Sequence, residues 1–168
     1  TMNFGATTTL EDAKDIADKS LDHGVFFWDT ADMYGNGASE EIVGRLMTGR
    51  RSEIVLATKV FAPLGPVPND RGLSARNILS ACENSLRRLN TDWIDLYYLH
   101  LPDRSVPIDE TLRALDDLVR GGKVRYIGVS TYAAWQHVDA LWAAKEHGLN
   151  RFVSEQPPYH ILERRIER

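Results

Sequence analysis

The sequence predicts an α/β fold built on a parallel sheet and closed as a (β/α)8 TIM barrel, and three observations favour it. Short apolar runs alternate with amphipathic helical stretches, as in repeated strand–helix units. The runs are almost continuously apolar, which is typical of parallel strands buried on both faces. No Gly-x-Gly-x-x-Gly follows the first strand, whereas polar side chains follow several strands. A barrel is therefore favoured over an open doubly wound sheet, because barrel chemistry comes from several strand ends.

The expected elements follow in chain order, and several have a start or stop signal. Thr9, Ser39 and Ser74 can each accept a backbone N–H as a helix N-cap, and Gly24 can stop the first helix. Helices are predicted over residues 9–22, 40–47, 74–89, 108–120 and 133–147. Strands are predicted over residues 1–4, 25–28, 54–60, 94–99, 124–130 and 151–154. The proline-rich residues 62–72 are predicted to be irregular, either as a binding loop or as a solvated linker.

The predicted strands supply about six of the eight units of a barrel. Open edges of a parallel sheet would leave backbone unpaired, so we expect residues 1–168 to be one partial barrel domain, truncated at both ends. Residues 163–168 read as the opening turn of a helix without a stop signal. Two explanations stay open: the last units lie outside this chain, which is favoured, or a second chain completes the barrel.

Composition excludes several classes of function. The 20 basic and 24 acidic residues leave a net charge of -4, which gives no general attraction for nucleic acid or an anionic membrane. No apolar stretch approaches the ~20 residues that cross a bilayer, and a cytoplasmic location is the expectation. The lone Cys82 is expected to be a small buried hydrophobe, and no metal-ligand spacing is present. A homo-oligomer is left open.

Polar side chains stand where three predicted strands end. Asp29 ends one strand and Tyr34 follows a short turn later, while Lys59 and His100 come at the ends of the next two long strands. Because the carboxyl ends of parallel strands share one rim, we expect these side chains to meet. An ammonium beside a phenol favours the phenolate, a carboxylate can anchor the ammonium, and an imidazole can polarise a carbonyl. The set predicts carbonyl reduction, with hydride from a cofactor.

These residues and several further segments, in the same order, resemble the aldo-keto reductase superfamily. The segments are Thr-Met-Asn-Phe-Gly at 1–5, Asp-Thr-Ala-Asp-Met-Tyr at 29–34, Ser-Leu-Arg-Arg-Leu at 85–89, Asp-Trp-Ile-Asp-Leu-Tyr at 92–97, Gly-Lys-Val-Arg-Tyr-Ile-Gly-Val-Ser at 122–130 and Gln-Pro-Pro-Tyr at 156–159. The resemblance covers essentially the whole chain. It implies an NADP-dependent oxidoreductase of the alcohol dehydrogenase type that reduces aldehydes or ketones to alcohols.

The resemblance also implies roles for individual residues. Tyr34 would be the general acid, tuned by Lys59, with His100 polarising the carbonyl and Asp29 anchoring Lys59 beside the cofactor. Ser130 and Gln156 would hold the carboxamide of NADPH. The family commonly has Ser-Asn where this chain has Ser130-Thr131, so Thr131 would offer a hydroxyl in place of an amide. The preference for NADPH over NADH rests on family habit.

Apolar residues flank this predicted centre. Met33, Phe61 and Leu101 are expected to line a pocket for a small carbonyl substrate, although packing beneath the loop is the alternative for Phe61. Asp95 is expected to be structural, and Trp28 to face the helices because strand side chains alternate. Three rival readings stay open: a structural Asp29–Lys59 ion pair, an NADPH-binding regulatory module resembling potassium channel β subunits, and an inactive barrel fragment.

Overall fold

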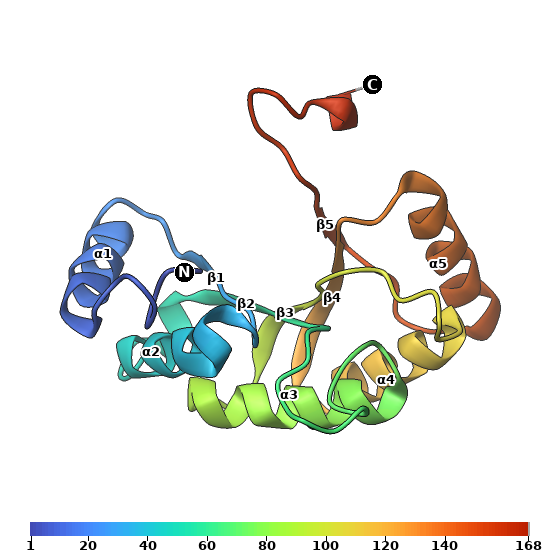
Figure 1. The fold of residues 1–168 in the computed structure, drawn as a ribbon, viewed down its shortest axis with the longest axis horizontal. Coiled ribbons are helices and arrows are strands. Elements are labelled where there is room, and N and C mark those ends of the chain that lie inside the picture. Colours follow the sequence, from blue (N-terminus) through green and yellow to red (C-terminus); the bar gives the residue numbers. More distant parts are fainter. Residues whose placement is uncertain (168) are drawn as a thin grey trace.

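The computed structural model describes residues 1–167 and shows a curved parallel sheet with helices along its convex side (Figure 1). Within these residues the sheet has five strands in sequential order: β1 (Phe27–Asp29), β2 (Val55–Val60), β3 (Ile94–Leu99), β4 (Val124–Ser130) and β5 (Ser154–Gln156). The α-helices are α1 (Leu10–Asp22), α2 (Ala38–Leu46), α3 (Ala75–Leu89), α4 (Ile108–Arg120) and α5 (Ala134–His147). The fold is a curled half-barrel, which agrees with the predicted parallel α/β class.

The strand predicted at residues 1–4 is wrong. Instead the chain turns there: the Phe4 N–H donates to the Thr1 carbonyl (2.9 Å), and Asn3 O accepts from Thr8 N (3.0 Å). Thr1 nevertheless lies beside the sheet, because its hydroxyl donates to the Asp29 carbonyl (2.9 Å). The described part of the chain therefore contributes five strands rather than the six predicted.

Two strands are shifted along the chain relative to the prediction. β1 starts at Phe27 rather than at residue 25, because the Val25 N–H donates to the Ser20 carbonyl at the end of α1 (2.7 Å). β5 starts at Ser154, the first residue in register with β4, and runs through Gln156 instead of ending at residue 154. The apolar residues Phe152 and Val153 led to the prediction of an earlier strand. The residues that pair with β4 are instead the polar ones that follow, Ser154 to Gln156.

Ser39 is not the N-cap of α2. That helix begins at Ala38 after Gly37, whose φ of 96° lies in the left-handed region that suits glycine. Ser39 is buried inside the helix, and its hydroxyl donates to the Thr1 carbonyl (2.9 Å). The predicted caps at Thr9 and Ser74 are confirmed, since each hydroxyl accepts a backbone N–H three residues later. Ser39 therefore makes a tertiary contact with Thr1 instead of the helix cap that its sequence position predicted.

The main core lies between the sheet and the helices. Trp28 faces α1, as predicted, and its indole N–H donates to the Ser20 hydroxyl (3.2 Å). Cys82 is fully buried in α3, as expected for a small hydrophobe, and burial raises the pKa of its thiol to about 12. Asp95 is structural, as predicted: it accepts from the Arg51 guanidinium (2.7 Å) and from the Leu56 N–H (2.9 Å).

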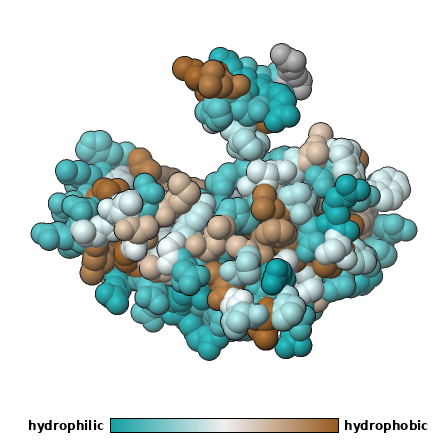
Figure 2. Space-filling model, in the orientation of Figure 1, coloured by the Kyte–Doolittle hydropathy of each residue, from teal (hydrophilic) through white to brown (hydrophobic). Residues whose placement is uncertain are grey.

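After β5 the chain rises away from the half-barrel (Figures 1 and 2). Its tip exposes Ile161 and Leu162, and a short 3₁₀ helix, η3, covers Arg165–Glu167. The helix start predicted at residues 163–168 is therefore a 3₁₀ turn, with Arg168 outside the described residues. Across residues 1–167, no helix combines the length and apolarity that a membrane crossing requires.

Candidate active site

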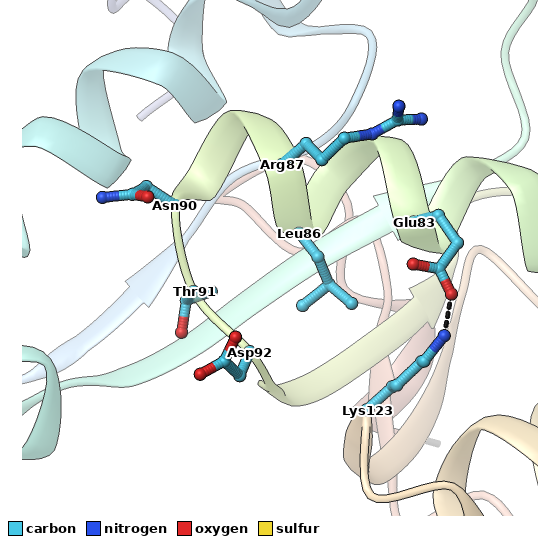
Figure 3. Close-up of a pocket in the computed structure, with 7 residues that line it drawn as sticks. All are labelled: Glu83, Leu86, Arg87, Asn90, Thr91, Asp92 and Lys123. Atoms are coloured by element: carbon cyan, nitrogen blue, oxygen red, sulfur yellow. Dashed lines mark hydrogen bonds and ion pairs between the residues drawn. The ribbon is translucent and has the colours of Figure 1, made fainter.

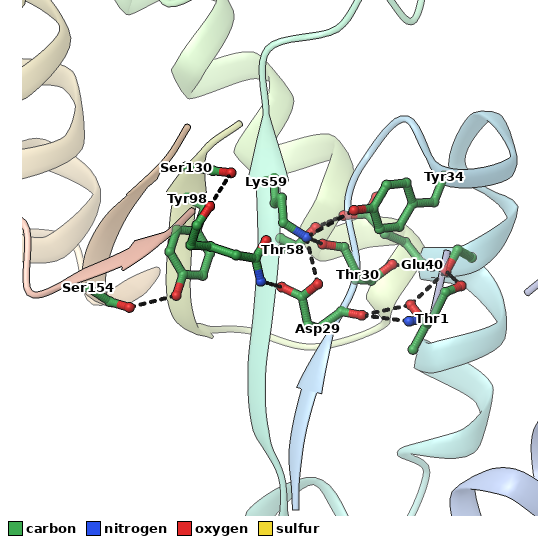
Figure 4. A network of polar contacts seen from close by, with 12 residues as sticks. Thr1, Asp29, Thr30, Tyr34, Glu40, Thr58, Lys59, Tyr98, Ser130 and Ser154 are labelled. Carbon is green, nitrogen blue, oxygen red and sulfur yellow. Dashed lines mark hydrogen bonds and ion pairs between the residues drawn. The ribbon is translucent and has the colours of Figure 1, made fainter. Parts of the chain in front are cut away.

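The carboxyl ends of β1, β2 and β3 bring the predicted polar residues to one rim. Asp29 is the last residue of β1, Lys59 is near the end of β2, and His100 follows β3. Tyr34 begins the 3₁₀ helix η1 (Tyr34–Gly37), which leads directly into α2. Figure 4 shows Asp29, Tyr34 and Lys59 pointing toward one another. The barrel rule that placed these residues at a common rim therefore holds in the half-barrel.

Lys59 is the centre of the polar network. Its side chain is 0% exposed, and its ammonium nitrogen donates to three oxygens: Asp29 Oδ2 (2.7 Å), the Thr30 carbonyl (2.8 Å) and Tyr34 Oη (3.3 Å). An ammonium has three N–H donors, so these contacts use all of them. Burying a charge is costly unless it is paired and hydrogen-bonded, and both conditions are met here. The ammonium is therefore held in place with one donor aimed at the phenol oxygen.

A tight turn places Tyr34 over Lys59. The Tyr34 N–H donates to the Ala31 carbonyl (3.1 Å), and the next residues, Gly35 and Asn36, have φ values of 58° and 57°. A Cβ on Gly35 would lie 3.3 Å from the Phe4 carbonyl oxygen, so the turn leaves little room for a side chain there. This turn returns the chain toward the rim, and the ammonium of Lys59 lies 4.9 Å from the Tyr34 ring centroid.

His100 contacts the edge of this centre. Its ring packs edge-on against Tyr34, with centroids 5.8 Å apart and planes at 82°. Burial and then the positive charge of Lys59 lower the pKa of His100 from its ordinary 6.5, while Asp29 opposes the shift. The imidazole is therefore neutral at neutral pH and carries one N–H. Its Nδ1 is buried and makes no hydrogen bond to any residue from 1 to 167.

The residues predicted to hold a cofactor lie on the same rim. Ser130 ends β4 and donates to the Gln156 carbonyl (2.9 Å). Gln156 ends β5, and its side-chain amide donates to Asp29 Oδ1 (3.3 Å), which links β5 to β1. The carboxylate of Asp29 thus accepts a hydrogen bond from Lys59 on Oδ2 and one from Gln156 on Oδ1.

This arrangement suits a nicotinamide carboxamide. That group needs an acceptor for its N–H and a donor for its C=O, and a glutamine side chain offers both. The contact with Asp29 fixes the orientation of the Gln156 amide and uses one N–H. Thr131 has φ 57°, and its hydroxyl is directed at the carbonyls of Ser130 (2.7 Å) and His100 (3.3 Å). A cofactor contact by Thr131 would therefore use the lone pairs of its oxygen.

The three apolar residues predicted to line a substrate pocket differ in burial. Met33 and Leu101 are 45% and 42% exposed beside the rim. Phe61 is half-buried and packs against the core. The two exposed side chains are available to an apolar substrate, and their role in a pocket stays a prediction.

Two polar contacts of the sheet were not predicted. The Thr30 carbonyl accepts from Lys59, and no sequence signal marks a backbone oxygen for such a role. Tyr98 Oη and Ser154 Oγ share a hydrogen bond of 2.7 Å on the inner face of the sheet. A Cβ on Gly128 would lie 2.6 Å from the Tyr98 ring, so a glycine in mid-strand was the available sign of that close approach.

A surface cavity of about 570 Å³ lies away from this rim (Figure 3). It is bordered by the end of α3, by the turn that enters β3, and by Lys123 just before β4. These positions are at the amino ends of the strands. Lys123 forms an ion pair with Glu83 across the opening. In barrels the amino-terminal face serves stability, so this cavity is not the candidate site.

Comparisons with known proteins agree with the geometry. The family model described as Aldo/keto reductase family matches residues 1–168. The chain is 44% identical to an uncharacterized oxidoreductase, YrpG, of Bacillus subtilis, covering 99% of this chain and 55% of that protein. It is 42% identical to a probable voltage-gated potassium channel subunit beta of Arabidopsis thaliana, with 98% and 52% covered.

A third relative, versiconal hemiacetal acetate reductase of Aspergillus parasiticus, is 37% identical, with 94% of this chain and 52% of that protein covered. The chain thus spans about half the length of the curated relatives it matches. Because the family model matches the whole chain, this protein belongs to the aldo/keto reductase family.

Proposed function

We propose that this chain forms part of an NADPH-dependent reductase that converts aldehydes or ketones to alcohols, with Tyr34 as the general acid. The observation that carries the proposal is the buried Lys59 ammonium, which donates to Tyr34 Oη (3.3 Å) and to Asp29 Oδ2 (2.7 Å). Family membership and the reductases among the relatives support the same reaction class. Residues 1–168 are then one partial (β/α)8 barrel domain.

Proton transfer is the task of Tyr34. Negative charge develops on the substrate oxygen as its carbonyl carbon is reduced, and the phenol hydroxyl gives that oxygen a proton. The phenolate that remains is stabilised by the ammonium of Lys59 at 3.3 Å. Asp29 holds the ammonium in place through their ion pair (2.7 Å), and its negative charge opposes the effect of the ammonium on the phenol. Its main contribution is therefore to position Lys59.

His100 supplies a second donor to the same oxygen. Its lowered pKa keeps the ring neutral, and because the buried Nδ1 has no acceptor among residues 1–167, the single N–H of the ring is assigned to Nε2. Tyr34 Oη and His100 Nε2 then form a pair of donors around the carbonyl oxygen, as in an oxyanion hole. The edge-on packing of the two rings fixes their relative orientation.

Ser130, Thr131, Gln156 and Asp29 would hold the nicotinamide end of the cofactor at the carboxyl ends of β4, β5 and β1. NADPH, when bound, supplies the hydride. The Gln156–Asp29 hydrogen bond orients the amide before the cofactor arrives. Met33, Phe61 and Leu101 would offer apolar contacts to a small carbonyl substrate.

The test is steady-state oxidation of NADPH with 4-nitrobenzaldehyde by the full-length protein. We expect Tyr34→Phe to lower kcat by at least ~100-fold, because loss of a general acid typically costs 10² to 10⁴ in rate. Tyr98→Phe is the matched control, since it removes a phenol oxygen that contacts Ser154 rather than Lys59. Full activity of Tyr34→Phe would overturn the assignment of Tyr34 as the acid.

A second candidate function is a nicotinamide-binding regulatory module. It is favoured by the similarity to a probable potassium channel β subunit, which is as strong as the similarity to the oxidoreductases. NADPH binding seen by calorimetry, without turnover of any carbonyl compound tried, would favour this candidate. Absence of both binding and turnover would favour an inactive barrel fragment.

A further inference from the structure

A second buried polar cluster lies behind the rim. Glu40 of α2 and Thr58 of β2 are fully buried, and the Thr58 hydroxyl donates to Glu40 Oε1 (2.6 Å). The other oxygen, Oε2, accepts from Arg88 Nε of α3 (2.6 Å). Figure 4 shows Glu40 and Thr58 adjoining the network around Lys59. Apolar residues often stabilise a core as well as a buried ion pair does. The presence of Glu40 and Arg88 here is therefore not explained by stability alone.

The cluster holds the strand that carries Lys59. Thr58 directly precedes Lys59 in β2, and because side chains alternate along a strand, Thr58 points to the helices while Lys59 points to the inner face. The hydrogen bond from Thr58 to Glu40 therefore holds β2 on its helix-facing side, at the residue directly before Lys59. On the same stretch of backbone, the Asp32 N–H donates to the Lys59 carbonyl (3.3 Å).

The same cluster holds the turn that carries Tyr34. The 3₁₀ helix that begins at Tyr34 ends at Gly37 and leads into α2, where Glu40 lies in the first turn. The Arg88 side chain packs directly against Gly37: a Cβ there would lie 2.9 Å from Arg88 Cδ. Glu40 thus connects the strand of Lys59, through Thr58, with the turn of Tyr34, through α2 and Arg88.

We propose that Glu40, with Thr58 and Arg88, is a positioning residue that sets the distance between Lys59 Nζ and Tyr34 Oη. Its effect on catalysis rests on the proposed function. Thr58 is the most informative position for a test, because valine has the shape of threonine but lacks the hydroxyl that donates to Glu40. Thr58→Ser keeps that hydroxyl and should restore the effect.

Thr111→Val is the matched control. Thr111 is also buried, and its hydroxyl donates to the Leu73 carbonyl (2.8 Å), outside the network of the rim. We expect both valine variants to lower the melting temperature by similar amounts. Only Thr58→Val should lower kcat, by ~10- to 100-fold, because small misplacements of reacting groups cost up to about 10² in rate. The KM for NADPH should stay unchanged, Thr58→Ser should recover activity, and Glu40→Gln should resemble Thr58→Val.

The inference is overturned if Thr58→Val lowers kcat no more than Thr111→Val does. Should the wild type show no turnover, the proposed reduction fails, but positioning remains testable in the full-length protein by NMR with ¹³C-labelled tyrosine. The chemical shift of the Tyr34 ring signal reports the position of the ring beside the Lys59 ammonium. A Tyr34 chemical shift that changes in Thr58→Val but not in Thr111→Val supports positioning. An identical Tyr34 chemical shift in all three proteins overturns it.

Discussion

Asp32 gives the folded state a dependence on pH that can be worked out from its surroundings. The residue is 1% exposed, and its Oδ1 is buried with no hydrogen-bond partner in the described part of the chain. Burial, and then the neighbouring Glu40 carboxylate, raise the pKa of Asp32 from 3.8 to about 7, against an opposing effect of Arg88. Between these two pH values the folded state keeps a proton that the unfolded state has lost.

The free energy of unfolding should therefore decrease as the pH rises through this interval. For each pH unit over which the folded state holds one more proton than the unfolded state, the free energy of unfolding falls by about 1.4 kcal/mol. The interval from 3.8 to about 7 therefore gives a maximum loss of about 4 kcal/mol. The contribution of Asp32 is fully present below pH 3.8, and it is lost by the time the pH exceeds about 7. An asparagine at this position cannot ionise and should remove that part of the pH dependence.

The assay is urea unfolding of wild type and Asp32→Asn at pH values between about 5 and 8. We expect the asparagine variant to gain stability relative to wild type as the pH rises, and to be the more stable protein at the alkaline end. Asp117→Asn, on an exposed face of α4, is the control for the loss of a carboxylate that is not buried. If the difference between wild type and Asp32→Asn does not change with pH, the burial argument is refuted.

Three further predictions concern the site and the core. Lys59→Met should lower kcat by ~100-fold or more in the NADPH oxidation assay, because it removes the charge beside the phenol, and activity near that of wild type would contradict the mechanism. Because the pKa of His100 is lowered, the log of kcat/KM should stay level as the pH falls through 6.5; a decline centred above 6.5 that disappears in His100→Gln would argue against a neutral donor. Cys82 should resist iodoacetamide in the native protein, because it is buried and the pKa of its thiol is raised to about 12. Mass spectrometry measures the labelling, and rapid labelling of the folded protein would contradict the burial of Cys82.

The sequence was sufficient for the parallel α/β class and for the rim residues, because both depend on period and order along the chain. Asp29, Lys59 and Tyr34 could be assigned to one rim once three apolar runs were recognised as strands. Element boundaries were less predictable, since tertiary contacts decide them. The polar Gln156 belongs to β5, and Ser39 serves a contact with Thr1 rather than a helix start.

The support behind the rim could not be predicted, because it depends on contacts between distant segments. Glu40 looks like an ordinary acidic residue in the first turn of a helix, which favours negative charge there. Its burial against Thr58 and Arg88, 18 and 48 residues away in sequence, appears only in three dimensions. The same holds for Asp32, whose pKa is raised first by its burial and then by the carboxylate of Glu40, across a turn and a helix start.

The contacts of Lys59 support the proposed reaction centre over the rival hypothesis of a structural ion pair at the rim. A buried ammonium could be satisfied by a carboxylate and main-chain carbonyls alone, and an apolar residue of similar volume often serves stability equally well. Here the third donor is instead directed at the phenol oxygen of Tyr34, whose ring also packs against the neutral His100. A positive charge beside a phenol favours the anion over the neutral form. That preference has a use only when the phenol gives up its proton, so the geometry fits proton transfer better than it fits a structural role.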